Sequence, residues 1–112
     1  MNPVSQSFSI YSGSSRSLLV TVTDVNGNPV NLTGVATLTW ALIQNGATVL
    51  TKTLASGVTV TGAIAGQATV ALAAADTTAL VGQYTHECRM VDSAGHSDVI
   101  FNGTLTVTKA YV

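Results

Sequence analysis

The residues best suited to chemistry begin with a histidine and a cysteine near the C-terminal end. His86, Cys88 and Met90 alternate along one run, and a Cys–His pair can supply a thiolate nucleophile or metal ligands. Residues two apart on one strand face only lie side by side, and no third group follows that could orient the imidazole. We therefore interpret His86 as a core or rim histidine and Cys88 as a buried thiol that behaves as a small apolar side chain.

A second polar group surrounds one expected turn and comprises Asp92, His96, Ser97 and Asp98. Serine, histidine and aspartate form hydrolytic triads, but adjacent strand residues point to opposite faces and cannot form that relay. Loop carboxylates with an imidazole could also bind zinc or manganese. We interpret the group as the solvated tip of a hairpin.

Other motifs are weaker still. Residues 24–28 imitate the start of a calcium loop, but such a loop needs glycine at its sixth position and glutamate at its twelfth. Pro29 and Val35 stand there, which excludes an EF-hand. Two glycosylation sequons, at 31–33 and 102–104, mean little without a secretory signal. The sequence predicts no catalytic, cofactor-binding or metal-binding residues, and we expect no enzyme and no cofactor.

Composition limits the partners. The 112 residues include four basic and five acidic ones, giving a net charge of −1, and 8% of the chain is charged against about 25% in ordinary domains. This excludes an electrostatic nucleic-acid binder, and the single cysteine excludes an internal disulfide. Thr, Val and Ala account for 46 residues, so the surface must be largely hydroxyl and methyl. It belongs either to a domain kept soluble by hydroxyls or to a subunit covered by partners.

Targeting signals are not visible in the sequence. The first six residues carry no cationic segment followed by an apolar run, and no stretch approaches the roughly 18 apolar residues of a spanning helix. We expect a complete small product of a cytoplasm, with no membrane partner.

The hydrophobic period is two, which is typical of half-buried antiparallel strands. Leu18, Val20 and Val22 alternate with Leu19, Thr21 and Thr23, and later runs repeat the pattern. Asn45-Gly46 predicts a type I′ hairpin turn, and residues 92–95 predict a type I turn. Residues 73–80 predict one helical turn with Asp76 as a candidate N-cap. The expected strands are 6–12, 16–24, 35–44, 47–54, 58–61, 67–73, 83–91 and 97–108.

Leu80, Gly82 and Tyr84, at the start of the penultimate strand, resemble the tyrosine corner of immunoglobulin-like sandwiches. Trp40 lies mid-strand, where such folds keep a core tryptophan, while Cys88 has no cysteine partner. We expect Tyr84 to be buried, with its hydroxyl bonded to backbone near residues 76–80. The resemblance implies one all-β domain over 1–112 with tails at 1–6 and 109–112: a Greek-key, immunoglobulin-like antiparallel β-sandwich of seven or eight strands without a disulfide.

A closer resemblance covers about residues 8–108. A succession of turn and core motifs resembles small immunoglobulin-like proteins of tailed bacteriophages and prophages: Asp24, Gly27, 29–30, 32–34, 57–60, 76–80, 82–84, 92–95 and 102–107. The resemblance implies a non-enzymatic virion protein of the tail, baseplate, a fibre adaptor or the head decoration. It implies other virion proteins as partners, and localisation in the virion after synthesis in the host bacterial cytoplasm.

Two uncharged outward rows predict the assembly surface. The interface is expected to bury part of the outer sheet face, a terminus, or both, over about 1,000 Å² or more, in a homo-oligomer or a lattice. The alternative is an immunoglobulin-like adhesion or carbohydrate-binding module, which would need an exposed aromatic pair. Because Trp40, Tyr84 and Phe101 are assigned to the core, few aromatic residues remain for one. The outward rows comprise Thr37, Thr39, Ala41 and Ile43, then Ile100, Asn102, Thr104, Thr106 and Thr108. Within these rows, we expect the interface to be formed by seven residues: Thr37, Thr39, Ala41, Ile43, Ile100, Thr104 and Thr106.

Overall fold

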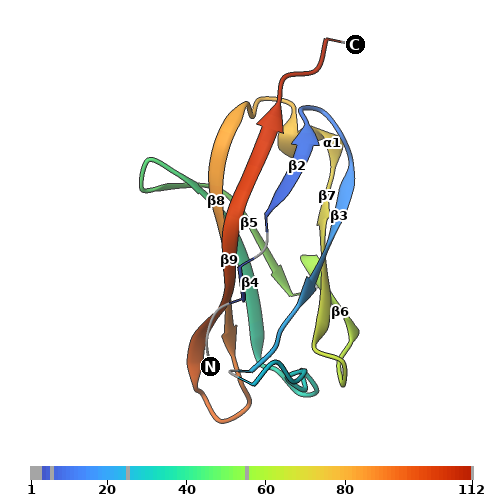
Figure 1. The fold of residues 1–112 in the computed structure, drawn as a ribbon, viewed down its shortest axis with the longest axis vertical. Coiled ribbons are helices and arrows are strands. Elements are labelled where there is room, and N and C mark those ends of the chain that lie inside the picture. The colour runs from blue at the N-terminus through green and yellow to red at the C-terminus, as the bar shows by residue number, and fades with distance from the viewer. Residues whose placement is uncertain (1–3, 6, 25, 55, 112) are drawn as a thin grey trace.

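The computed structural model describes residues 4–5, 7–24, 26–54 and 56–111, and the side chains of residues 4, 5 and 101 lie outside that description. The expected core position of Phe101 is therefore outside the described residues. In the described part the chain is built from β-strands and one short helix (Figure 1). The elements are β1 (Val4–Ser5), β2 (Phe8–Tyr11), β3 (Arg16–Thr21), β4 (Thr37–Gln44), β5 (Ala47–Leu54), β6 (Gly57–Gly62), β7 (Gln67–Leu72), α1 (Ala74–Thr77), β8 (Gly82–Val91) and β9 (Ser97–Thr108).

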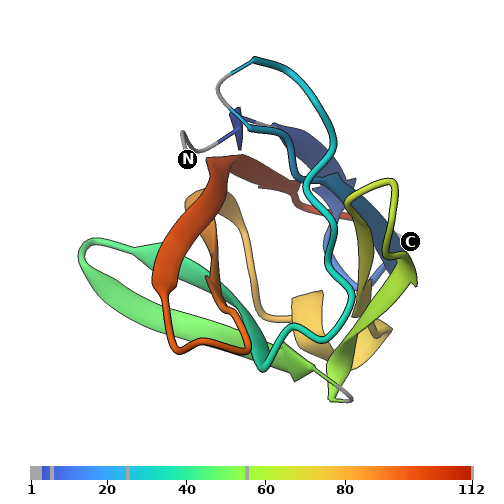
Figure 2. The same cartoon turned by 90° about the horizontal axis from the view of Figure 1, so that it is seen from below.

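The strands form one mixed sheet in the order β1-β9-β8-β4-β5-β6-β7-β3, with β2 also paired to β9. Only two residue pairs join β5 to β6, and the sheet curls into a nearly closed layer around one core (Figure 2). The expectation of purely antiparallel pairing is wrong, since β1 and β2 run parallel to β9, and β5 runs parallel to β6. The strands β1 and β2 lie far from β9 in the sequence, so no hairpin turn forces them antiparallel. By contrast, β5 and β6 are separated only by residues 55–56 and run parallel over two residue pairs. The strand β1 also lies in the segment expected to be a tail.

The interior follows the period-two pattern over most strands. Leu18, Val20 and Val22 are buried, and Leu19 between them is 52% exposed. On the two central strands, Trp40 and Cys88 face each other in register and are both buried. The alternation therefore positions one apolar layer inside the sheet and leaves a second layer facing outward.

The pattern fails at one place on β9. The register between β8 and β9 shifts between Cys88 and Arg89, whose partners are Phe101 and Val99. Ile100 is the extra residue of this β-bulge and is 1% exposed. Its expected outward position, and with it a place on an outer interface, is wrong, because a bulge reverses the facing of residues on one side of it.

Two local predictions are confirmed, one with a shift. Asn45 and Gly46 both adopt positive φ, at 54° and 77°, which is the requirement of a type I′ turn. Tyr84 is buried, and its hydroxyl lies 3.1 Å from the backbone nitrogen of Val81 and 3.2 Å from its carbonyl oxygen. The corner thus closes on Val81, one residue beyond the expected segment 76–80.

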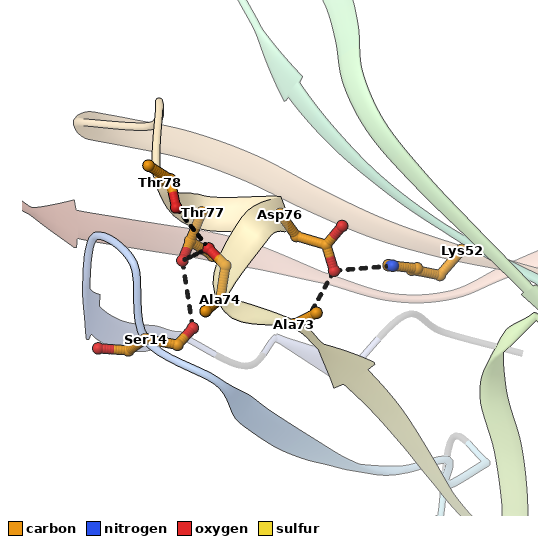
Figure 3. Close-up of polar contacts among 7 residues, drawn as sticks. All are labelled: Ser14, Lys52, Ala73, Ala74, Asp76, Thr77 and Thr78. Carbon is orange, nitrogen blue, oxygen red and sulfur yellow. Dashed lines mark hydrogen bonds and ion pairs between the residues drawn. The ribbon is translucent and has the colours of Figure 1, made fainter.

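The helix α1 is a single turn held by side chains (Figure 3). Asp76 is its third residue rather than its N-cap, which is Ala73. The backbone N–H of Ala73 donates to the Asp76 carboxylate at 2.8 Å, and Lys52 Nζ of β5 lies 2.8 Å from the same oxygen. The Lys52 ammonium and then the Ala73 N–H hold the pKa of Asp76 below its ordinary value. In the described residues, no helix has the length and apolar character needed to cross a membrane.

Candidate assembly surface

The candidate surface is the outer face of the sheet over β5, β4, β8 and β9, on the side away from the core. Because Trp40 and Cys88 point inward, their strand neighbours Thr39 and Arg89 point outward, and so do Ala41 and Glu87. We call this surface the outer face. Its members on the three central strands are Thr37, Thr39, Ala41, Ile43, Gln83, Thr85, Glu87, Arg89, Val91, Val99, Asn102, Thr104 and Thr106.

Six of the seven residues predicted for the interface lie on this face. Thr37 and Thr104 are exposed, while the other four are half-buried by their neighbours. The two rows are not adjacent, however, because β8 runs between β4 and β9. The six residues are therefore brought onto one surface but not into mutual contact: Thr37, Thr39, Ala41, Ile43, Thr104 and Thr106.

The row of β8 carries two residues that the sequence reasoning missed. Glu87 and Arg89 are exposed at the middle of the outer face, opposite Ala41 and Thr39 of β4. Arg89 donates a hydrogen bond to Ser97 Oγ at 3.0 Å. The alternation along β8 in the sequence already indicates that Glu87 and Arg89 point outward. It does not indicate that β8 lies between β4 and β9, because the order of the strands depends on contacts between residues far apart in the chain.

The outer face is hollowed at two points. One shallow hollow of about 230 Å³ is lined by Glu87 and Arg89 together with Thr39, Ala41 and Val99. A second, of about 280 Å³, lies toward the β4–β5 hairpin and is lined mainly by amide and hydroxyl side chains such as Gln44 and Gln83. The surface thus offers room for side chains of a partner.

The inner side of the same strands holds the Cys–His pair. His86 is fully buried, and the indole N–H of Trp40 donates to its Nδ1 at 3.2 Å, so the neutral ring carries its proton on Nε2. The Phe8 ring lies edge-on to the imidazole, with the two ring centres 5.4 Å apart. Burial raises the pKa of the Cys88 thiol to about 12, which keeps it protonated at neutral pH. Both residues therefore lie in the core, and Cys88 lacks the thiolate that a nucleophile needs.

The polar group at residues 92–98 forms a hairpin tip, as expected. The Asp92 carboxylate accepts the backbone N–H groups of Ala94 and His96, each at 2.9 Å, and lies 3.1 Å from the His96 ring. These donors, led by the backbone N–H of His96, lower the pKa of Asp92. Ser97 instead bonds Arg89, so the arrangement orders a turn rather than a relay.

The other candidate loop also uses its carboxylate for its own backbone. Asp24 accepts the N–H groups of Asn26 and Asn28 at 2.9 and 3.0 Å, which is a turn-stabilising arrangement. Across residues 4–5, 7–24, 26–54 and 56–111, no three histidine, cysteine or acidic side chains gather closely enough to hold a metal ion.

The largest of the hollows described lies at the end of the molecule where β2 and β9 finish. Tyr11 and Tyr111 both line this hollow of about 460 Å³, and they are 58% and 87% exposed. Lys109 Nζ lies 5.5 Å from the centre of the Tyr111 ring, and the N–H of Ala110 donates to Ser12 Oγ at 3.0 Å. An exposed aromatic pair therefore exists, formed by Tyr11 and Tyr111, which lie near opposite ends of the sequence.

The comparisons with known proteins give distant likenesses. No protein-family model matches the chain, and no curated protein matches it in sequence. CopC from Methylosinus trichosporium OB3b aligns with 87% of this chain and 98% of its own at 16% identity and a TM-score of 0.42. AggA, the major subunit of aggregative adherence fimbriae type I from Escherichia coli, aligns with 96% of this chain and 100% of its own at 13% identity and a TM-score of 0.38.

Proposed function

We propose that this chain is a non-enzymatic structural subunit that acts through protein–protein assembly, and that its assembly is a bacteriophage virion. The observation that carries the proposal is the outer face. Its rows on β4 and β9 are hydroxyl-bearing, amide or aliphatic, and its only charges on the three central strands are Glu87 and Arg89. Charged residues are the usual protection against sheet association, and this face has few.

We also propose that the fold is immunoglobulin-like, and the order of the strands supports this. The group β4-β8-β9, with β5 beside β4, corresponds to the C, F and G strands of that fold, and β3-β7-β6 corresponds to B, E and D. The Tyr84 corner at the start of β8 stands where the fold keeps it. The motif succession over residues 8–108 supports the virion as the place of assembly.

The test is the particle mass of the protein in solution with lysine placed on the outer face. We expect the wild-type chain to self-associate reversibly in sedimentation equilibrium, and Thr39→Lys with Thr106→Lys to weaken that association at least tenfold. Thr59→Lys, at an exposed position of β6 outside this face, is the matched control and should associate like wild type. A wild-type protein that remains monomeric at high concentration and binds no capsid or tail component would refute the proposal.

A specific observation also favours a second function, carbohydrate binding at the Tyr11–Tyr111 hollow. Two exposed tyrosine rings around a hollow of about 460 Å³ offer the flat apolar surfaces on which sugar rings stack, and Ser12 and Ser14 add hydroxyl groups beside them. In a glycan array, a monomer that binds and loses binding in Tyr11→Ala and Tyr111→Ala would support this function. Leu19→Ala, at an exposed site on β3, is the control. If no glycan binds, carbohydrate binding is excluded.

A further inference from the structure

The charges of the outer face form a self-complementary pattern. The chain has four basic and five acidic residues, and one of each, Arg89 and Glu87, lies two residues apart on the outward row of β8. No ion pair joins either to another described side chain. By contrast, Lys52 forms an ion pair with Asp76 of the same chain. Arg89 donates a hydrogen bond to the neutral Ser97 side chain, so no described residue neutralises either charge of the outer face.

We propose that the outer face pairs with a second copy of this chain about a two-fold axis that crosses the strands at the level of Trp40 and Cys88. Glu87 of each copy then meets Arg89 of the other. This inference rests on the proposed assembly function and specifies its partner and its geometry.

The charges choose between two possible axes. When two sheets meet face to face by two-fold symmetry, the axis lies in the plane between them. An axis along the strands and over β8 would set Glu87 against Glu87 of the second copy, and Arg89 against Arg89, and like charges in contact are strongly unfavourable. The same axis moved to the boundary with β4 would set Glu87 against Ala41 and Arg89 against Thr39, which buries each charge without an opposite partner. An axis across the strands at Cys88 exchanges the two positions and sets opposite charges together. The strands of the two copies then run antiparallel, within the roughly 30° of aligned sheet packing.

The neighbouring strand fits the same axis. Trp40 pairs with Cys88, so the outward row of β4 is centred at the same level. The axis therefore sets Thr39 against Ala41 of the second copy, and Thr37 against Ile43, with no charge in either pair. The hollow of about 230 Å³ lies at this level and gives room for the long side chains of Glu87 and Arg89.

The experiment is a charge reversal in which two defective variants restore each other. Glu87→Lys and Arg89→Glu each place like charges across the axis, so each should raise the dimer dissociation constant at least tenfold in sedimentation equilibrium. Mixed in equal amounts, with one variant ¹⁵N-labelled, they should form the mixed dimer in native mass spectrometry, because every contact is then between opposite charges. The double variant Glu87→Arg with Arg89→Glu should regain wild-type association. Added salt should weaken the association of the double variant and of the wild type.

The controls are Thr59→Lys and Thr59→Glu, which add the same charges outside the outer face. The inference is overturned if the wild type associates, and lysine at Thr39 and Thr106 weakens it, while the single charge reversals behave like wild type or the mixture forms no mixed dimer. That result leaves the proposed assembly function intact. A wild-type chain that is monomeric throughout overturns the inference, and it overturns the proposed function as well if the chain also binds no capsid or tail component.

Discussion

The strands β4, β8 and β9 carry two faces of opposite character. On the inner face, Trp40 donates to His86, Cys88 is buried as a neutral thiol, and these groups are sealed from solvent. On the outer face, Glu87 and Arg89 stand among hydroxyl and aliphatic side chains beside an open hollow. The residues that first suggest chemistry thus lie in the core, and the residues on the outer face are the ones for which we propose a partner.

The charges show the same contrast. Lys52 and Asp76 face each other at 2.8 Å with side chains only 18% and 19% exposed, and they tie β5 to α1 (Figure 3). Glu87 makes no comparable ion pair with a described residue. One ion pair of this charge-poor chain therefore stabilises its own fold. The charges of the outer face form no ion pair with a described residue, and they are the ones that bear on the proposed assembly.

The largest expected effect tests whether the two faces are correctly assigned on β9. Ile100→Lys should lower the free energy of unfolding by about 4 kcal/mol or more, because it buries an ammonium group without a partner. Thr104→Lys, on the same strand but outward and exposed, should change it by less than about 0.5 kcal/mol. Urea denaturation at low protein concentration measures both. If the Ile100→Lys protein is as stable as wild type, the Ile100 side chain lies on the outer face and not in the core.

Tyr84 tests how the inner face begins. Tyr84→Phe should lower the free energy of unfolding by about 1–3 kcal/mol, because the backbone N–H of Val81 loses the hydroxyl that accepts it. Thermal or urea denaturation gives the value. An unchanged stability would show that the corner bond contributes nothing to the fold.

Asp76 tests the ion pair that the chain keeps for itself. Asp76→Asn retains an acceptor for the Ala73 N–H but loses the charge facing Lys52, and should cost about 1 kcal/mol at neutral pH. Since the folded protein lowers the pKa of Asp76, this stability is complete above the ordinary pKa of about 3.9 and is lost as pH falls through the lower folded value. The difference between wild type and variant should therefore vanish in acid. A difference that persists there would assign the effect to something other than the carboxylate charge.

Cys88 is tested by the rate of its reaction with a thiol reagent, without any substitution. Because the thiol is 3% exposed with its pKa raised to about 12, a thiol reagent should label the native protein slowly at pH 8. Labelling should accelerate in denaturant as the core opens. Rapid labelling of the native chain would place Cys88 outside the core.

The sequence predicts this fold well where structure is set locally. The Asn45–Gly46 turn follows from the positive φ that those residues tolerate, and the buried row of β3 follows from alternation. Ile100 is missed because a bulge adds one residue that no periodic pattern records. The parallel pairing of β2 with β9 is missed because it joins segments far apart in the chain.

The candidate site was predicted only in part, for the same reason. Alternation assigns Thr39 and Thr106 outward, which is where they lie. It does not reveal that β8 runs between their strands, so Glu87 and Arg89 were not connected with the surface. The aromatic pair Tyr11 and Tyr111 was likewise hidden, since it forms only where the two ends of the chain meet.

The most direct test of the central claim is the accessibility of a cysteine placed on the outer face as protein concentration rises. Thr39→Cys and Thr59→Cys each add one reactive thiol beside the slow Cys88, on the outer face and on β6 respectively. Labelling of Thr39→Cys should slow at least tenfold as the chain associates, while labelling of Thr59→Cys stays constant. Equal rates for the two sites at every concentration, in a chain that associates, would show that assembly does not use the outer face.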